Sequence, residues 1–173
     1  MLIKRTLPVL GLFGGLFSGL FGAFAISGTA QAATDNTFDI RPYEAAATCG
    51  AQTLQIKVIV ENVTAQGILT VELYRPSKRS FLKKASRLHR IRVPAKSGEQ
   101  TVCFDIEQAG SYAVAVYQDI DADRRLKKKW NRMPAEPFAL SNKKKLAFEM
   151  PKFDDAAFQV PATGTVIRIK LQR

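Results

Sequence analysis

Alternating apolar and polar residues recur along most of the chain, and this pattern limits the fold more than any other feature. Successive side chains of a β-strand point to opposite faces, so alternation predicts strands with one buried face and one solvated face. The alternating runs cover residues 54–60, 69–73, 91–93, 102–106 and 167–171. Turn-forming pairs such as Gln66-Gly67 and Thr163-Gly164 separate these runs.

Residues 112–117 differ from the other runs and predict a central strand. Every position of this segment is apolar, and alanine occupies alternate positions, as suits a strand covered on both faces. Seven or more short strands at near-regular spacing, with no long helical pattern after residue 32, predict an all-β fold. We expect an antiparallel β-sandwich of the immunoglobulin-like or prealbumin-like kind. A single helical turn is expected at residues 154–158.

The first 32 residues have the pattern of an N-terminal signal helix for secretion. The Lys4-Arg5 pair gives a positive start, and no charged residue occurs at positions 6–34. Ala30-Gln31-Ala32 offers small residues at the two positions that a signal peptidase reads, which predicts cleavage after Ala32. The alternative is a retained membrane anchor, because the uncharged run is long enough to cross ~30 Å of hydrocarbon.

These boundaries predict three parts of the chain. Residues 1–32 form the signal peptide, residues 33–50 an N-terminal extension, and residues 51–173 the β-sandwich domain. The predicted location is periplasmic or secreted. After signal cleavage the protein is not expected to be an integral membrane protein.

Two cysteines, Cys49 and Cys103, allow one disulfide bond, and export makes that bond permissible. Strand alternation places Cys103 on the face opposite Val102 and Phe104. The bond should therefore tie the N-terminal segment to the outer face or to an edge of a sheet. The alternative is two unpaired thiols.

Three carboxylates follow the predicted central strand at alternate positions. Asp119, Asp121 and Asp123 have the spacing of the first ligands of a calcium loop. The sixth position, where such a loop needs glycine, is Arg124, and the ninth is Lys127. One interpretation is a metal site, with calcium as the candidate ion.

The other interpretation is a turn in which the aspartates bind backbone N–H groups and neighbouring cations. Trp130 stands at the twelfth position, where a calcium loop needs a bidentate glutamate. Glu136, between two prolines, would join the three aspartates in a metal-dependent enzyme. We predict no cofactor, with calcium as the alternative.

Several short motifs occur in a fixed order from residue 110 onwards. They are Tyr112-Ala113-Val114, the three aspartates of the 119–123 loop, Pro134-Ala135-Glu136, Ser141-Asn142 and the 151–156 segment Pro-Lys-Phe-Asp-Asp-Ala. In this order the chain, over residues 54–171, resembles the uncharacterised bacterial family called domain of unknown function 2141. The resemblance implies an exported, sandwich-type domain and implies no activity. The chain departs from the family pattern at Arg124 and Lys127.

Basic residues outnumber acidic ones, 26 to 15, and the formal net charge is +11. They concentrate in residues 75–96 and 124–145, which hold nine Lys or Arg each. Dense positive charge attracts polyanions. The candidate anion-binding residues are Arg124, Arg125, Lys127, Lys128, Lys129, Lys143, Lys144 and Lys145.

The partners expected for these clusters outside the cytoplasm are anionic lipid, lipopolysaccharide and acidic glycan, with no specific nucleic acid. We hypothesise that the two clusters form one face. The alternative is an ordinary solvated surface in a basic protein.

Motifs for catalysis are missing from the sequence. It contains one histidine, and it lacks a nucleophile elbow, a phosphate-binding loop and a dinucleotide fingerprint. We therefore predict an exported, non-catalytic binding module rather than an enzyme. The alternative is a metal-dependent hydrolase or a calcium-binding domain that uses the 119–123 loop.

Overall fold

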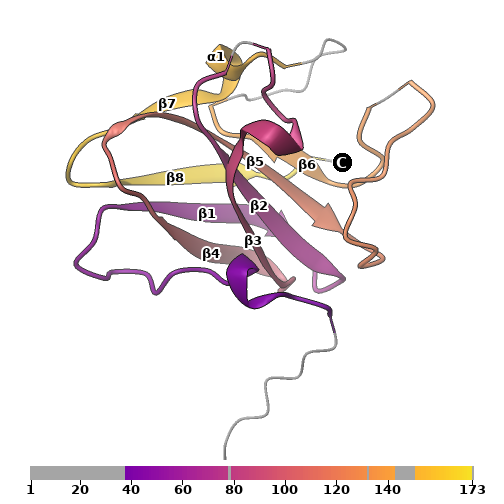
Figure 1. The fold of residues 1–173 in the computed structure, drawn as a ribbon. Coiled ribbons are helices and arrows are strands. Elements are labelled where there is room, and N and C mark those ends of the chain that lie inside the picture. The colour runs from indigo at the N-terminus through magenta and orange to yellow at the C-terminus, as the bar shows by residue number, and fades with distance from the viewer. Residues whose placement is uncertain (1–37, 78, 132, 143–150, 173) are drawn as a thin grey trace, which may run out of the picture. The chain divides into compact units, whose positions relative to one another are not determined.

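The computed structural model describes residues 38–77, 79–131, 133–142 and 151–172, which form eight strands and three short helical turns (Figure 1). The strands are β1 (Gln55–Val63), β2 (Ile68–Tyr74), β3 (Arg87–Pro94), β4 (Gly98–Asp105), β5 (Gly110–Asp119), β6 (Phe138–Leu140), β7 (Ala157–Val160) and β8 (Thr165–Lys170). The helical turns are η1 (Pro42–Glu44), η2 (Lys84–Ser86) and α1 (Phe153–Ala156).

The strands build two packed sheets, so the predicted all-β sandwich is confirmed. Sheet A has the strand order β4-β1-β8, and sheet B the order β3-β2-β5-β6, with β7 also paired to β5. All these pairs are antiparallel except β1 with β8. β6 and β7 both pair antiparallel with β5, so these two consecutive strands run in the same direction. A chain that reversed at every connection would instead bring β8 antiparallel to β1.

Alternate residues of both sheets fill the space between them, as the period-two pattern predicts. Ile56, Val58 and Val60 of β1 are fully buried against the inward side chains of sheet B, such as Val71 and Val114. Burying an aliphatic side chain of this size contributes about 1.5–3 kcal/mol. This shared core holds the two sheets together.

The outer face of sheet B, which is turned away from sheet A, is also buried, and here the expectation of a solvated face on residues 69–73 is wrong. Thr70 and Glu72 of β2 are only 0% and 8% exposed. The reason is a second apolar cluster, in which Phe81 packs edge-on against Tyr74 at 5.3 Å between ring centroids and against Phe153 at 5.7 Å. Loops on both sides of the sheet thus cover a face that local sequence marks as polar.

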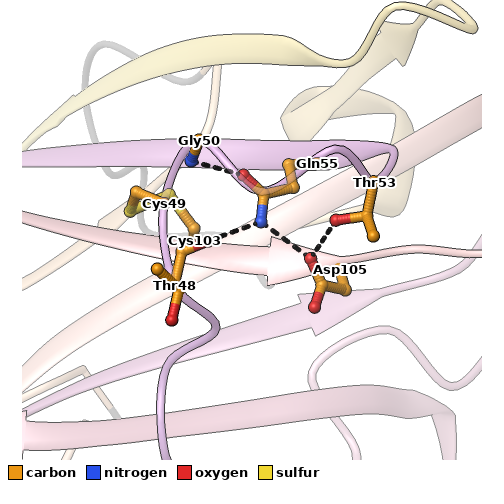
Figure 2. The surroundings of a disulfide bond; sticks show 7 residues. All are labelled: Thr48, Cys49, Gly50, Thr53, Gln55, Cys103 and Asp105. Atoms are coloured by element: carbon orange, nitrogen blue, oxygen red, sulfur yellow. Dashed lines mark hydrogen bonds between the residues drawn. A yellow bond between two sulfur atoms is a disulfide. The ribbon is translucent and has the colours of Figure 1, made fainter.

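Residues 38–50 pack against edge strands of both sheets. Ala47 pairs with Cys103 on β4, one of the two edge strands of sheet A, and the predicted Cys49–Cys103 disulfide is present (Figure 2). The turn η1 lies beside β3, the edge strand of sheet B (Figure 1). The extension is therefore bound to the domain at two points.

Side chains around the disulfide fix the local loop. Gln55 accepts a hydrogen bond from the Gly50 backbone N–H and donates to the Asp105 carboxylate at 2.7 Å (Figure 2). Thr53 donates to the same carboxylate oxygen at 2.8 Å. These two donors hold the pKa of Asp105 below its usual range.

The predicted signal peptide, residues 1–32, lies outside the described residues. Within the part of the chain that the structure describes, none of the helices has the length and apolar character needed to cross a membrane.

Candidate functional site

The aspartate loop begins where β5 ends. Asp119 is fully buried, and its two carboxylate oxygens accept the backbone N–H groups of Asp123, at 3.1 Å, and Arg124, at 2.7 Å. The chain can turn this sharply because Ala122 and Arg124 adopt the left-handed conformation, with φ of 57° and 68°. Carboxylate oxygens of Asp119, Asp121 and Asp123 come within 4.8 Å of one another.

Glu136 completes the hydrogen bonding of this loop from its far end. Its two oxygens accept the backbone N–H groups of Ile120 and Lys127, both at 2.9 Å. Asp121, by contrast, is exposed and forms an ion pair with the Lys127 ammonium. Most of the carboxylate oxygens in the loop therefore bind groups of the loop itself.

The electrostatics of the loop follow from these contacts. Burial raises the pKa of Asp119 above its usual value, and the charge of Glu136 adds to this rise, while the Arg124 backbone N–H opposes it. The hydrogen bond from Lys127 lowers the pKa of Asp121. The Lys127 ammonium thus supplies, within the chain, a positive charge beside the clustered aspartates.

Calcium at about 1 mM should change the free energy of unfolding by less than about 0.5 kcal/mol, because Lys127 already neutralises Asp121. A true site with a Kd of about 10 µM would add about 2.7 kcal/mol at that concentration. Urea unfolding with calcium and with a chelator measures the difference.

Lys127→Asp is the matched variant for the calcium experiment, since it places a carboxylate at the ninth loop position. We expect calcium to stabilise Lys127→Asp more than the unchanged protein. A calcium-dependent gain above about 1 kcal/mol in the unchanged protein would instead establish a metal site.

A second feature is a pocket of about 610 Å³ on the outer face of sheet B. Its floor comes from β3, β2, β5 and β6, with Tyr74, Ala115, Tyr117 and Phe138 among the lining side chains. The loop before β3 and the loop after β5 form its walls. The orange loop after β5 projects away from the sheets in Figure 1.

Members of both basic clusters line this pocket. Its basic residues, among those the structure describes, are Lys83, Lys84, Arg87, Arg90, Arg124, Arg125 and Lys128. Glu72 is the acidic residue among the described lining residues. Segments about 40 residues apart in the sequence therefore place positive charge around one cavity.

The predicted anion-binding residues differ in how accessible their charges are. Arg125, Lys128 and Lys129 are exposed, and the first two line the pocket. Lys127 is paired with Asp121, as described above. Residues 143–145, which hold the other three predicted lysines, Lys143, Lys144 and Lys145, lie outside the described residues.

Arg124 is the predicted anion-binding residue whose charge is most fully engaged by the protein. Its guanidinium binds both oxygens of Glu44, at 3.0 and 3.1 Å, and its backbone carbonyl accepts a hydrogen bond from Arg92 at 3.0 Å. Arg92 also binds Glu44 directly, and both side chains are almost fully buried. The alternation of apolar and polar residues in this strand predicts a solvated Arg92, so the sequence analysis missed the cluster of Glu44, Arg92 and Arg124.

Comparison with known proteins gives one result. The family described as "Uncharacterized protein conserved in bacteria (DUF2141)" matches residues 58–168. The chain belongs to this family. No curated protein and no solved structure matches the chain. The region that matches domain of unknown function 2141 runs from β1 to β8, so it contains the aspartate loop and the pocket-lining residues. Glu44 and Cys49 precede this region.

Proposed function

We propose that this protein is an exported, non-catalytic module that binds anionic lipid of the cell envelope through its basic loops. The observation that carries the proposal is the convergence of both basic clusters around one pocket. Phosphate groups are the shared chemistry of lipopolysaccharide and anionic phospholipid, so one basic surface serves for either source.

A projecting hairpin supports a lipid surface as the partner. The backbone N–H of Lys129 donates to Met133 at 2.8 Å, and that of Ala135 donates to Lys127 at 2.8 Å. Trp130, near the tip of this hairpin, is 97% exposed. Tryptophan favours the boundary between lipid head groups and acyl chains, where one end of the ring is apolar and the other is hydrated.

The charge around the hairpin supports the same conclusion. Lys128 and Lys129 are exposed next to Trp130, and Arg125 lies at the start of the loop. Each Lys or Arg near an anionic membrane contributes about 1 kcal/mol of attraction. Because the attraction falls off over about 10 Å at 0.1 M salt, binding should depend steeply on ionic strength.

Reversing the charge of the hairpin should weaken binding to anionic vesicles by roughly 30- to 1,000-fold. The variant is Lys128→Glu with Lys129→Glu, and each reversal replaces about 1 kcal/mol of attraction by repulsion. Co-sedimentation with vesicles of phosphatidylglycerol and phosphatidylcholine, at several salt concentrations, measures the effect.

The matched control reverses Lys57 and Lys170, two exposed lysines of sheet A, and changes the net charge by the same amount. It should bind almost as well as the unchanged protein. Equal losses in the two variants, salt-insensitive binding, or binding to a soluble acidic glycan without binding to vesicles would each contradict the proposal.

A further inference from the structure

The pocket floor changes from charged to apolar across the strands of sheet B. In one row of the sheet, Arg90 of β3 pairs with Glu72 of β2, which pairs in turn with Ala115 of β5. In a neighbouring row, Tyr117 of β5 pairs with Phe138 of β6. Among the lining residues that belong to strands, the cations therefore lie on β3 and the apolar side chains of these rows on β5 and β6.

Arg90 and Arg87 are held in place at the charged end. Both donate to the same carboxylate oxygen of Glu72, at 2.8 and 2.9 Å, and the Tyr74 hydroxyl donates to the other oxygen. One carboxylate thus orients two guanidinium groups and leaves a net positive charge. Guanidinium groups fixed in this way suit the oxygens of a phosphate or carboxylate.

Ala115 makes room at the apolar end. It lines the pocket between larger neighbours and is 1% exposed, so a longer side chain at this position would extend into the cavity. Leu126 packs against the same apolar cluster from the loop after β5. A volume of about 610 Å³ falls in the range of cavities that enclose small ligands.

We infer that this pocket binds a single amphipathic anion, with its acidic group at Arg87 and Arg90 and its apolar chain over Ala115 and Phe138. A simple polyanion would bind the arginines but leave the apolar floor uncovered, and a neutral lipid would leave the net positive charge of Arg87, Arg90 and Glu72 without a counter-ion. The inference rests on the proposed function for the source of the ligand, since anionic envelope lipids are amphipathic anions. Beyond attachment to a lipid surface, the inference states that a single ligand molecule enters the pocket.

A series of alkyl phosphates, all below their micelle concentrations, tests the inference by calorimetry on the full-length domain after the signal. Each methylene that enters the pocket should tighten binding about fourfold, which corresponds to ~0.8 kcal/mol. The gain should stop at the chain length that fills the pocket. Fatty carboxylates of equal length distinguish phosphate from a general acidic group.

Two variants should alter this series in different ways. Ala115→Leu should make the gain stop at a shorter chain, whereas Arg90→Ala should weaken every member by the same factor. Ala115→Val, a smaller enlargement at the same position, serves in place of Ala115→Leu if that variant fails to fold. Thr101→Leu, exposed on β4, is the control and should leave the series unchanged.

Outcomes of the two experiments separate this inference from the proposed function. Salt-dependent vesicle binding, together with alkyl phosphate affinities that do not rise with chain length, would overturn the pocket and leave surface attachment standing. Chain-length-dependent binding without vesicle binding would support the pocket and contradict surface attachment. Equal binding of alkyl trimethylammonium ions would contradict the assignment of the charged end.

Discussion

Replacing Glu44 by glutamine should lower the free energy of unfolding by about 3–5 kcal/mol, since the change leaves two guanidinium groups of a buried cluster without their counter-charge. Glu44 is 2% exposed, and its carboxylate binds both Arg92 and Arg124. Glutamine keeps the size of the side chain, so loss of charge rather than loss of packing causes the effect.

The pH dependence of stability gives a second measure of the same cluster. Burial alone would raise the pKa of Glu44, but the Arg41 backbone N–H and the guanidinium groups of Arg92 and Arg124 outweigh it and lower the pKa below the ordinary 4.5. A lowered pKa in the folded state adds stability above the ordinary value. This stability is lost as the pH falls through the lowered pKa.

Urea unfolding at pH 7 and at successively lower pH measures both effects. The difference between Glu44→Gln and the unchanged protein should be largest at pH 7 and should narrow below pH 4.5, where Glu44 itself becomes neutral. Glu99→Gln is the matched control, because Glu99 pairs with Arg168 at an exposed position. Its loss should stay below about 1 kcal/mol, and an equal loss in both variants would contradict the prediction.

Removing the disulfide should cost about 4 kcal/mol, the chain-entropy value for the long loop that it closes. The bond joins cysteines 54 residues apart in the sequence. Cys49→Ser with Cys103→Ala is the suitable variant, because Cys103 is fully buried and a hydroxyl there would lack solvent. The melting temperature should fall by roughly 10–15 °C.

Reduction of the unchanged protein provides the control for this variant. Thermal unfolding in the presence of a reductant should reproduce the melting temperature of the double variant. The variant itself should not respond to the reductant. A loss below about 1 kcal/mol would show that residues 38–50 stay docked without the covalent bond.

Strand patterns in the sequence predict most of this fold. Six of the eight strands coincide with the alternating or apolar runs, and β5 is covered on both faces, as its alanines indicate. The short strands β6 and β7 were missed, since three or four residues are too few to display a period. The helical turn expected at residues 154–158 is present at Phe153–Ala156.

The candidate site is less predictable, because it depends on contacts between distant segments. The aspartate loop is formed by residues close together in the sequence, so the sequence indicates both of its possible roles, a metal site and a turn held by aspartate side chains. The burial of Glu72 and Arg92, by contrast, depends on loops and on an N-terminal segment that fold over sheet B. Local alternation identifies an arginine in a strand, but it cannot predict a glutamate 48 residues away that will bury it.

The covalent link between Cys49 and Cys103 also determines how the domain would respond to mechanical tension. A pull between the two ends of the chain passes from Cys49 straight into β4. Residues 50–102, which contain β1, β2 and β3, lie inside the closed loop, so this pull cannot stretch them along the backbone. The disulfide therefore limits mechanical extension to the segments outside this closed loop. More than a third of the domain cannot be lengthened while the bond is intact, even when the strands around it separate.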